Sequence, residues 1–234
     1  MEQTDINKIF ITFIIPTIGR QTLIDTIESL YNLNIDVSLW RAIIIFDNCV
    51  GNRLIKNELH EQIIKIDTNN NIKIITSVEH IGNQSKRNSA GLVRNIGIQS
   101  IDFLTEWIGF VDDDDTLSPD YIKNLQSEIE ISHSIEVCIF RMIYENNCVL
   151  PAKYDRNLLR GKVGISFALK YSLAKQYLFT NNPFEDFLYL KNLQNMGIKI
   201  LISSYISYYV RCKCDNKNID AKYLNEQYPK IFIN

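Results

Sequence analysis

Four consecutive aspartates, Asp112 to Asp115, directly follow the apolar segment 107–111. Adjacent carboxylates repel one another, so a cluster of this kind costs folding free energy. A bound cation removes that cost, and oxygen ligands suit Mg²⁺ or Mn²⁺, which often bridge to substrate phosphates. The alternative is a solvated acidic turn, or Asp115 capping the next turn. The position of the cluster at the end of a predicted buried strand favours the cation site.

Polar residues also end the two apolar segments nearest the N-terminus. Thr17 and Arg20 follow the first segment, and Asp47 follows the second. In open sheets of parallel strands, ligands bind beyond the carboxyl ends of the strands. These residues are therefore expected to meet the aspartates at one edge of a sheet and to form a ligand site there.

The elements that would position these residues follow from apolar runs, helical periodicity and turn residues. The predicted strands are 10–15, 42–46, 72–75, 107–111, 135–144, 198–203 and 205–210. Helices are predicted to start near residues 22, 52, 89, 119 and 182 and to end near 30, 66, 104, 129 and 197. The alternation of strands and helices predicts an α/β fold with a Rossmann-like, mainly parallel sheet flanked by helices.

Length and composition restrict the class of protein. The chain has 234 residues, of which 46% are hydrophobic and 22% charged, which excludes a disordered or coiled-coil protein. The net charge of -2 gives no general attraction for nucleic acid, so a bound phosphate needs a local site. An odd number of cysteines and the lack of a signal-like N-terminus predict a soluble cytoplasmic protein, which an acceptor substrate could hold at a membrane surface.

The segment Phe110–Asp120 resembles the DxD region of family 2 glycosyltransferases. Segment 14–20 is similar to that family's first strand and nucleotide-binding turn, and segment 90–98 to its G-x-x-RN-x-GI motif. Segment 184–188, with 197–199 after it, resembles the ED motif and the strand that follows it. These segments occur in the order and spacing of the family.

The resemblance implies a single GT-A (nucleotide-diphospho-sugar transferase) domain over residues 1–211. A nucleotide-sugar half would cover about 8–118 and an acceptor half about 119–211, with a polar tail at 212–234. The implied activity is metal-dependent, inverting transfer of a hexosyl or N-acetylhexosaminyl group. The expected donor is UDP-linked, and the acceptor would be a hydroxyl of a glycan, a protein or a lipid-linked molecule.

The resemblance also implies roles for individual residues. Asp186 would be the general base, and its place in the first helical turn is expected to keep it ionised. Mn²⁺ or Mg²⁺ would bind at Asp112 and Asp114, with Asp114 the more direct ligand. The residues implied in donor binding are Pro16, Thr17, Arg20, Asp47 (against uracil), Arg94, Asp112 and Asp113 (near ribose).

Several of these assignments have alternatives. Asp47 could form an Asx turn, Arg94 could pair with the acidic edge, and Glu185 could be the third residue of a capping box begun by Asn182. Family members often place a histidine after the last core strand, where this chain has Tyr208–Cys212.

Two other functions compete with the transferase. The pattern Asp112-x-Asp114-x-Thr116 also fits the DxDxT motif of haloacid-dehalogenase-type phosphatases, with Asp112 as nucleophile and Asp114 as acid/base. A non-catalytic nucleotide-sugar-binding protein is the other alternative.

Overall fold

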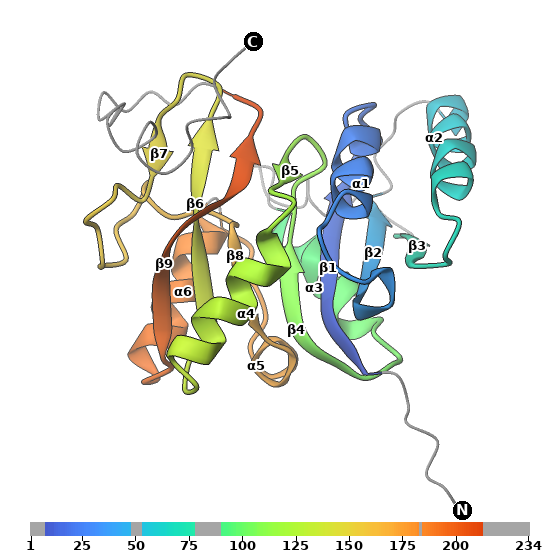
Figure 1. Cartoon of the computed structure of the whole chain (residues 1–234). Helices are drawn as coiled ribbons and strands as arrows, with labels where there is room; N and C mark the ends of the chain where they lie inside the picture. Colours follow the sequence, from blue (N-terminus) through green and yellow to red (C-terminus); the bar gives the residue numbers. More distant parts are fainter. Residues whose placement is uncertain (1–7, 48–52, 78–89, 183, 213–234) are drawn as a thin grey trace, which may run out of the picture.

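The computed structural model describes residues 8–47, 53–77, 90–182 and 184–212. These residues form a nine-stranded sheet in the order β3-β2-β1-β4-β8-β6-β9-β5, with β7 paired to β6 (Figure 1). The strands are β1 (Ile9–Thr17), β2 (Trp40–Phe46), β3 (Ile72–Thr76), β4 (Thr105–Phe110), β5 (Thr116–Leu117), β6 (Val137–Tyr144), β7 (Val149–Leu150), β8 (Phe167–Lys170) and β9 (Ile200–Val210).

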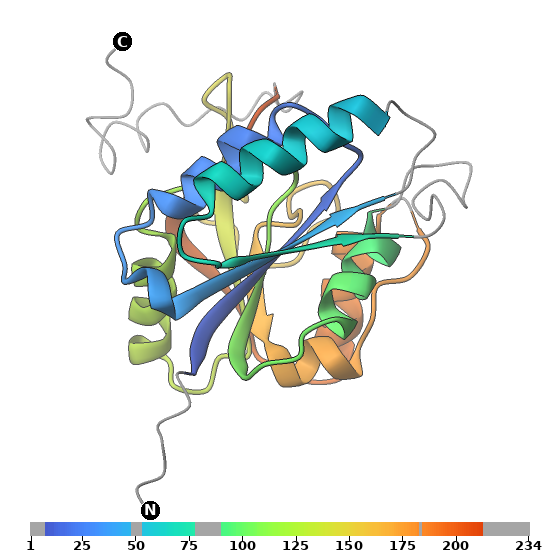
Figure 2. The ribbon, with the colours of Figure 1, turned by 90° about the vertical axis from the view of Figure 1, so that its right-hand side faces the viewer.

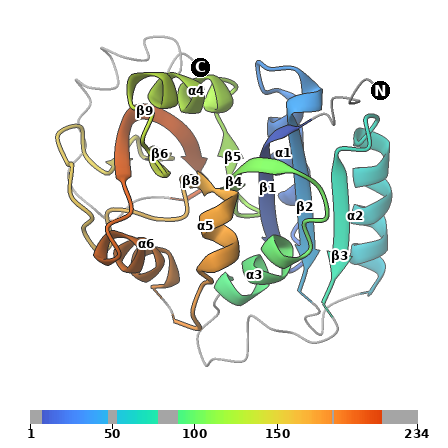
Figure 3. The same ribbon diagram turned by 90° about the horizontal axis from the view of Figure 1, so that it is seen from below.

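Helices cover both faces of the sheet. They are α1 (Leu23–Tyr31), α2 (Arg53–Ile66), α3 (Gly91–Gln99), α4 (Tyr121–Ile131), α5 (Tyr171–Gln176) and α6 (Glu185–Asn195), with a short 3₁₀ helix at Val37–Leu39. Figure 2 shows α1, α2 and α4 on one face of the sheet, and Figure 3 shows α3, α5 and α6 together on the other. Among the described helices, none is long and apolar enough to cross a membrane.

The α/β fold class and the mostly parallel sheet are confirmed. Strands β3, β2, β1 and β4 are mutually parallel, and so are β6 and β9. The short β8, which was not predicted, lies antiparallel between β4 and β6. Because β8 opposes both neighbours, β6 and β9 run in the same direction as β1.

Some predicted boundaries were wrong. The segments 198–203 and 205–210 form one strand, β9, and the helix expected to reach about 104 ends at Gln99. Strand β1 continues through Pro16 to Thr17, beyond the predicted end of the strand at residue 15. Beyond Ile14, β1 is paired with β2 and no longer with β4, so Pro16 lies where one edge of the strand has lost its partner. Helix α5 was not predicted.

Because they run in the same direction, strands β1, β2, β4 and β9 have their carboxyl-terminal ends at the same edge of the sheet. The Asp47 amide donates a 2.8 Å hydrogen bond to the Thr17 carbonyl, which ties the ends of β2 and β1 together. At the end of β9, the Arg211 amide donates to Asp115 Oδ1 at 2.9 Å. The expected convergence of strand ends is therefore confirmed, and β9 is part of it.

Helix α3 packs closely on β1 and β2 because residue 97 is glycine. A Cβ atom at Gly97 would lie 2.7 Å from both Ile14 Cγ2 and Ile45 Cδ1, which are side-chain atoms of β1 and β2. Close packing of this kind does not accommodate an added methyl group without strain.

The division into donor and acceptor halves stays a prediction, and residues 213–234 of the predicted tail lie outside the described part of the chain.

Candidate active site

The loop that carries the four aspartates, Asp112 to Asp115, is called the aspartate loop, and it has two inward and two outward carboxylates. Asp113 and Asp115 are buried, whereas the side chains of Asp112 and Asp114 are partly exposed. The Asp115 amide donates to the Asp112 carbonyl at 3.1 Å, which closes a turn. Alternate side chains therefore face opposite ways, and the exposed pair is the predicted DxD pair.

The inward carboxylates hold the loop to the strand ends. Asp113 accepts hydrogen bonds from Thr17 Oγ1 at 2.6 Å and from Arg20 Nη1 at 2.9 Å. Burial raises the pKa of Asp113, and these two partners oppose the shift. A ribose contact at Asp113 would compete with both hydrogen bonds.

Asp115 joins the loop to β9. Burial, followed by the nearby Asp112, raises the pKa of Asp115 to about 7, although the Arg211 amide and the Tyr208 hydroxyl both donate to its carboxyl group. Asp115 therefore anchors β9 instead of capping the next turn.

Tyr208 was not predicted as a site residue. Its hydroxyl accepts from the Asp112 amide at 3.0 Å and donates to Asp115, and burial together with these two aspartates raises its pKa well above the usual value. In the sequence, the indication of a role for Tyr208 was its position in the segment where members of the resembled family often have a histidine.

The outward carboxylates each accept a hydrogen bond from an arginine. Arg94 Nη2 donates to Asp112 Oδ1 at 2.6 Å, and Arg20 Nη1 donates to Asp114 Oδ2 at 2.7 Å. In the described part of the chain, no group of three or more His, Cys, Asp or Glu side chains is arranged to hold a metal ion. Both carboxylates of the predicted DxD pair are therefore engaged by a guanidinium group.

Arg94 connects the aspartate loop to α6. Its side chain is only 2% exposed, and Nη1 donates to Glu185 Oε1 at 3.0 Å and to Asp186 Oδ1 at 3.3 Å. Burial lowers the pKa of Arg94, but the carboxylates of Asp112, Asp186 and Glu185 outweigh this and raise it overall. The ion pairing of Arg94 with the acidic edge, one of the two expectations for this residue, is confirmed.

Glu185 does not occupy the expected position of a capping box. Helix α6 begins at Glu185, so this residue is the first of the helix, and Asn182 Oδ1 accepts from the Phe184 amide at 3.1 Å. Glu185 Oε1 accepts from the Gly91 amide at 3.0 Å as well as from Arg94. A glycine is required at position 91, because a Cβ atom there would lie 2.8 Å from Phe179 Cβ.

Asp186 lies in the first turn of α6, as predicted. Burial raises its pKa to about 7, although Arg94 opposes the shift. Desolvation of the carboxylate therefore opposes the ionised form that the helix terminus favours. The side chain is 28% exposed, so a ligand can still reach it.

The remaining predicted residues lie at the ends of β1 and β2. Asp47 is buried, and its Oδ1 accepts from Ser77 Oγ at 3.2 Å. Pro16 and Thr17 are the last two residues of β1. The alternative of an Asx turn after Asp47 falls on residues 48–52, which lie outside the described part of the chain.

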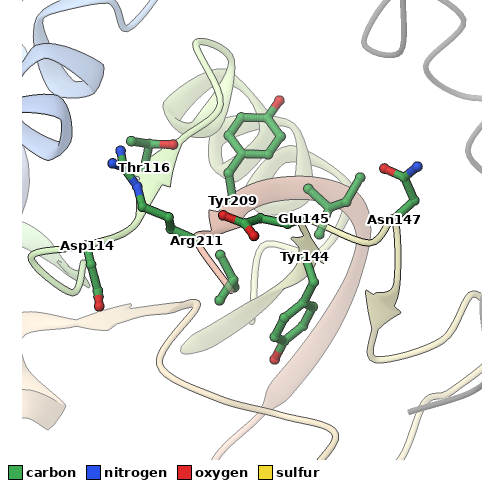
Figure 4. A pocket seen from close by; sticks show the side chains of 9 residues that line it. Asp114, Thr116, Tyr144, Glu145, Asn147, Tyr209 and Arg211 are labelled. Atoms are coloured by element: carbon green, nitrogen blue, oxygen red, sulfur yellow. The ribbon is translucent and has the colours of Figure 1, made fainter. Parts of the chain in front are cut away.

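A cavity of about 270 Å³ adjoins Asp114 (Figure 4). It lies between the end of β9, β5 and the hairpin formed by β6 and β7. Its lining consists of Asp114, Thr116, Ile143, Tyr144, Glu145, Asn147, Tyr209, Val210 and Arg211. The aspartate loop therefore has open space on the side of β6 and β9.

Comparisons with known proteins identify the fold. No family model and no curated protein matches the chain. Among solved structures, S. aureus TarS 1–349 in complex with UDP is 18% identical, with a TM-score of 0.68 over 88% of this chain and 61% of that chain. The complex of TarS 1–349 with UDP-GlcNAc is 17% identical, with a TM-score of 0.67 over 91% of this chain and 61% of that one.

A third structure, of S. aureus TarS 1–349, is 17% identical, with a TM-score of 0.66 over 87% of this chain. This chain spans only about 60% of the length of that structure. The predicted likeness to family 2-type glycosyltransferases is thus found at the level of structure, and the chain has the GT-A fold.

Proposed function

We propose that this protein is a glycosyltransferase that moves a sugar from a UDP-linked donor to an acceptor hydroxyl with inversion at the anomeric carbon. The main supporting observation is the Arg94 bridge, which joins Asp112 of the DxD pair to Asp186, the predicted base, at one edge of the sheet. The complexes of TarS with UDP and UDP-GlcNAc support a UDP-linked donor. The transferred hexosyl or N-acetylhexosaminyl group is part of the proposal.

In this proposal the nucleotide lies over the ends of β1 and β2. Pro16 and Thr17 line it, and Asp47 accepts a hydrogen bond from the uracil N3–H. Arg20 and Arg94 are the cations that lie beside the diphosphate. The cavity next to Asp114 supports an acceptor on the other side of the aspartate loop.

Asp112 and Asp114 would hold Mn²⁺ or Mg²⁺ together with diphosphate oxygens. When bound, such a cation neutralises charge on the departing diphosphate. Arg94 and Arg20 already provide positive charge at the same two carboxylates. These arginines would then be shared between the carboxylates and the diphosphate.

Asp186 would accept the proton of the acceptor hydroxyl. A bond then forms between the acceptor oxygen and the anomeric carbon while the bond from that carbon to the diphosphate breaks, and the proton ends on the Asp186 carboxylate. The pKa of about 7 suits this role, because a general base works best when its pKa lies near the working pH.

Metal dependence can be tested through UDP binding. UDP should raise the apparent melting temperature more with Mn²⁺ than with EDTA, because a ligand that binds only the folded state stabilises it. Asp114→Asn should remove most of that difference while leaving the unliganded protein folded. An equal shift by UDP in Mn²⁺ and in EDTA would contradict the metal site without contradicting UDP binding.

The base contact at Asp47 can be tested separately. Cytosine lacks the N3–H of uracil, so Asp47→Ala should weaken UDP binding by roughly 1–3 kcal/mol and reduce the preference for UDP over CDP. Isothermal titration with both nucleotides measures this. Ser77→Ala is the matched control, because it removes the hydrogen bond to Asp47 and keeps the carboxylate. An unchanged nucleotide preference in Asp47→Ala would remove this assignment.

The phosphatase alternative is less well supported by the geometry. In that enzyme Asp112 would be the nucleophile, but here its Oδ1 accepts a 2.6 Å hydrogen bond from a buried arginine. Hydrolysis of a generic phosphomonoester distinguishes the alternatives, because the phosphatase should show it and the transferase should not. A non-catalytic binding protein would bind UDP-sugars and show no transfer with any acceptor.

A further inference from the structure

The segment 151–165, between β7 and β8, is strongly basic. Its residues 152–162 carry four basic side chains and one acidic side chain, whereas the whole chain has a net charge of -2. In the described part of the chain, no carboxylate lies within ion-pair distance of Arg156, Arg160 or Lys162. These three side chains therefore present a local positive charge that the rest of the described chain does not neutralise.

A buried arginine holds the base of this segment in place. Arg141 of β6 is fully buried, and its guanidinium donates to the carbonyls of Pro151, Ala152 and Lys153, the last at 3.0 Å. Burying a guanidinium is costly unless it is hydrogen-bonded. The fold thus uses an internal charge to fix the start of a segment that is itself largely exposed.

Exposed apolar side chains lie among these basic residues. Tyr154 is 80% exposed and Leu159 is 47% exposed. The Arg160 guanidinium stacks on the Phe184 ring at 3.6 Å from its centroid, and Phe184 is still 43% exposed. This contact brings the basic segment against the residue that precedes Glu185 and Asp186.

We propose that segment 152–162 together with Phe184 is a docking surface for an anionic lipid bilayer. Basic side chains near a membrane are attracted by anionic headgroups, and tyrosine and leucine side chains gain free energy by entering the interface. A soluble polyanion would explain the basic residues, but it would not explain the exposed Leu159 and Tyr154. The surface adjoins the start of α6, so docking would turn the Asp186 side of the molecule toward the membrane. In Figures 1 and 3 the segment extends from the side of the molecule away from β3 and α2.

Flotation of the full chain with lipid vesicles tests this surface. We expect binding to phosphatidylcholine vesicles that contain phosphatidylglycerol, at least tenfold weaker binding to phosphatidylcholine alone, and loss of binding in about 1 M salt. Arg156→Gln with Lys162→Gln should weaken binding by about 25-fold, since each basic residue contributes roughly fivefold. Tyr154→Ser with Leu159→Ser should weaken it by about tenfold.

Matched controls change the same chemistry elsewhere. Lys65→Gln with Lys123→Gln removes the same charge from α2 and α4, and Ile64→Ser with Ile131→Ser removes exposed apolar side chains from the same helices. Both should leave vesicle binding unchanged, and thermal unfolding verifies that every variant is folded.

Equal binding to both kinds of vesicle, or equal losses in segment and control variants, would overturn the proposal. The proposal would also be overturned if polyphosphate competed with the vesicles and Tyr154→Ser with Leu159→Ser had no effect. The surface would then recognise charge alone. The proposal does not depend on the transferase function. UDP-induced stabilisation measured on the same samples shows separately whether the nucleotide site is intact.

Discussion

Asp186→Asn is expected to lower turnover by roughly 10²–10⁴, the usual range for loss of a general base. Asparagine keeps the shape of the side chain and cannot accept the proton of the acceptor hydroxyl. UDP binding should be retained, because Asp186 is not itself among the proposed nucleotide contacts. Initial rates at saturating donor, on an acceptor verified by product analysis, measure the effect.

The pH dependence provides a second measurement of Asp186. The basic form is the ionised form, so with a pKa of about 7 it becomes less populated as pH falls below 7. The wild-type kcat/KM should therefore fall about tenfold per pH unit below pH 7 and level off above it. Asp186→Asn should lack this dependence. Activity within about tenfold of wild type would exclude Asp186 as the base, and a product with retained configuration would exclude inversion.

Arg94→Met is expected to lower the free energy of unfolding by about 3–5 kcal/mol. Removing one partner of a buried ion pair leaves the other charges uncompensated, and Arg94 is only 2% exposed while it contacts Asp112, Glu185 and Asp186. Urea unfolding followed by circular dichroism measures the loss.

The loss in Arg94→Met should depend on pH. Arg94 lowers the pKa of Asp186, so without the guanidinium this pKa rises still further above its ordinary, unfolded value. The unfolded state then binds fewer protons than the folded state, so stability falls as pH rises above about 4. The deficit relative to wild type should be larger at pH 8 than at pH 5.

Two control variants show whether burial causes this effect. Arg20→Met removes an arginine that contacts Asp113 and Asp114, but the Arg20 side chain is 47% exposed. Exposed ion pairs contribute about 0–1 kcal/mol, so its loss should be small. Arg94→Lys keeps the charge and should recover part of the stability. Equal losses in Arg94→Met and Arg20→Met would show that the Arg94 bridge has no special role.

Much of the site was predictable from local sequence. Buried strands appear as short apolar runs, and the residue that ends a run is visible without knowledge of the fold. Parallel strand direction then places Thr17, Asp47 and the aspartate loop at one edge, which the Asp47 to Thr17 hydrogen bond confirms. The short strand β8 and helix α5 were missed because they lie in a region without a clear apolar period.

The sequence by itself determined the α/β class, the acidic loop at the edge of the sheet and the place of Asp186 in the first turn of α6. Only the tertiary structure decided which aspartates face inward, that Tyr208 and Arg211 support them from β9, and that Arg94 joins Asp112 to Asp186. It also decided the burial of Asp186, which raises the pKa of this carboxyl group to about 7. The physical reason is that burial and pairing depend on residues far apart in the chain, whereas apolar runs and helix starts depend on neighbours.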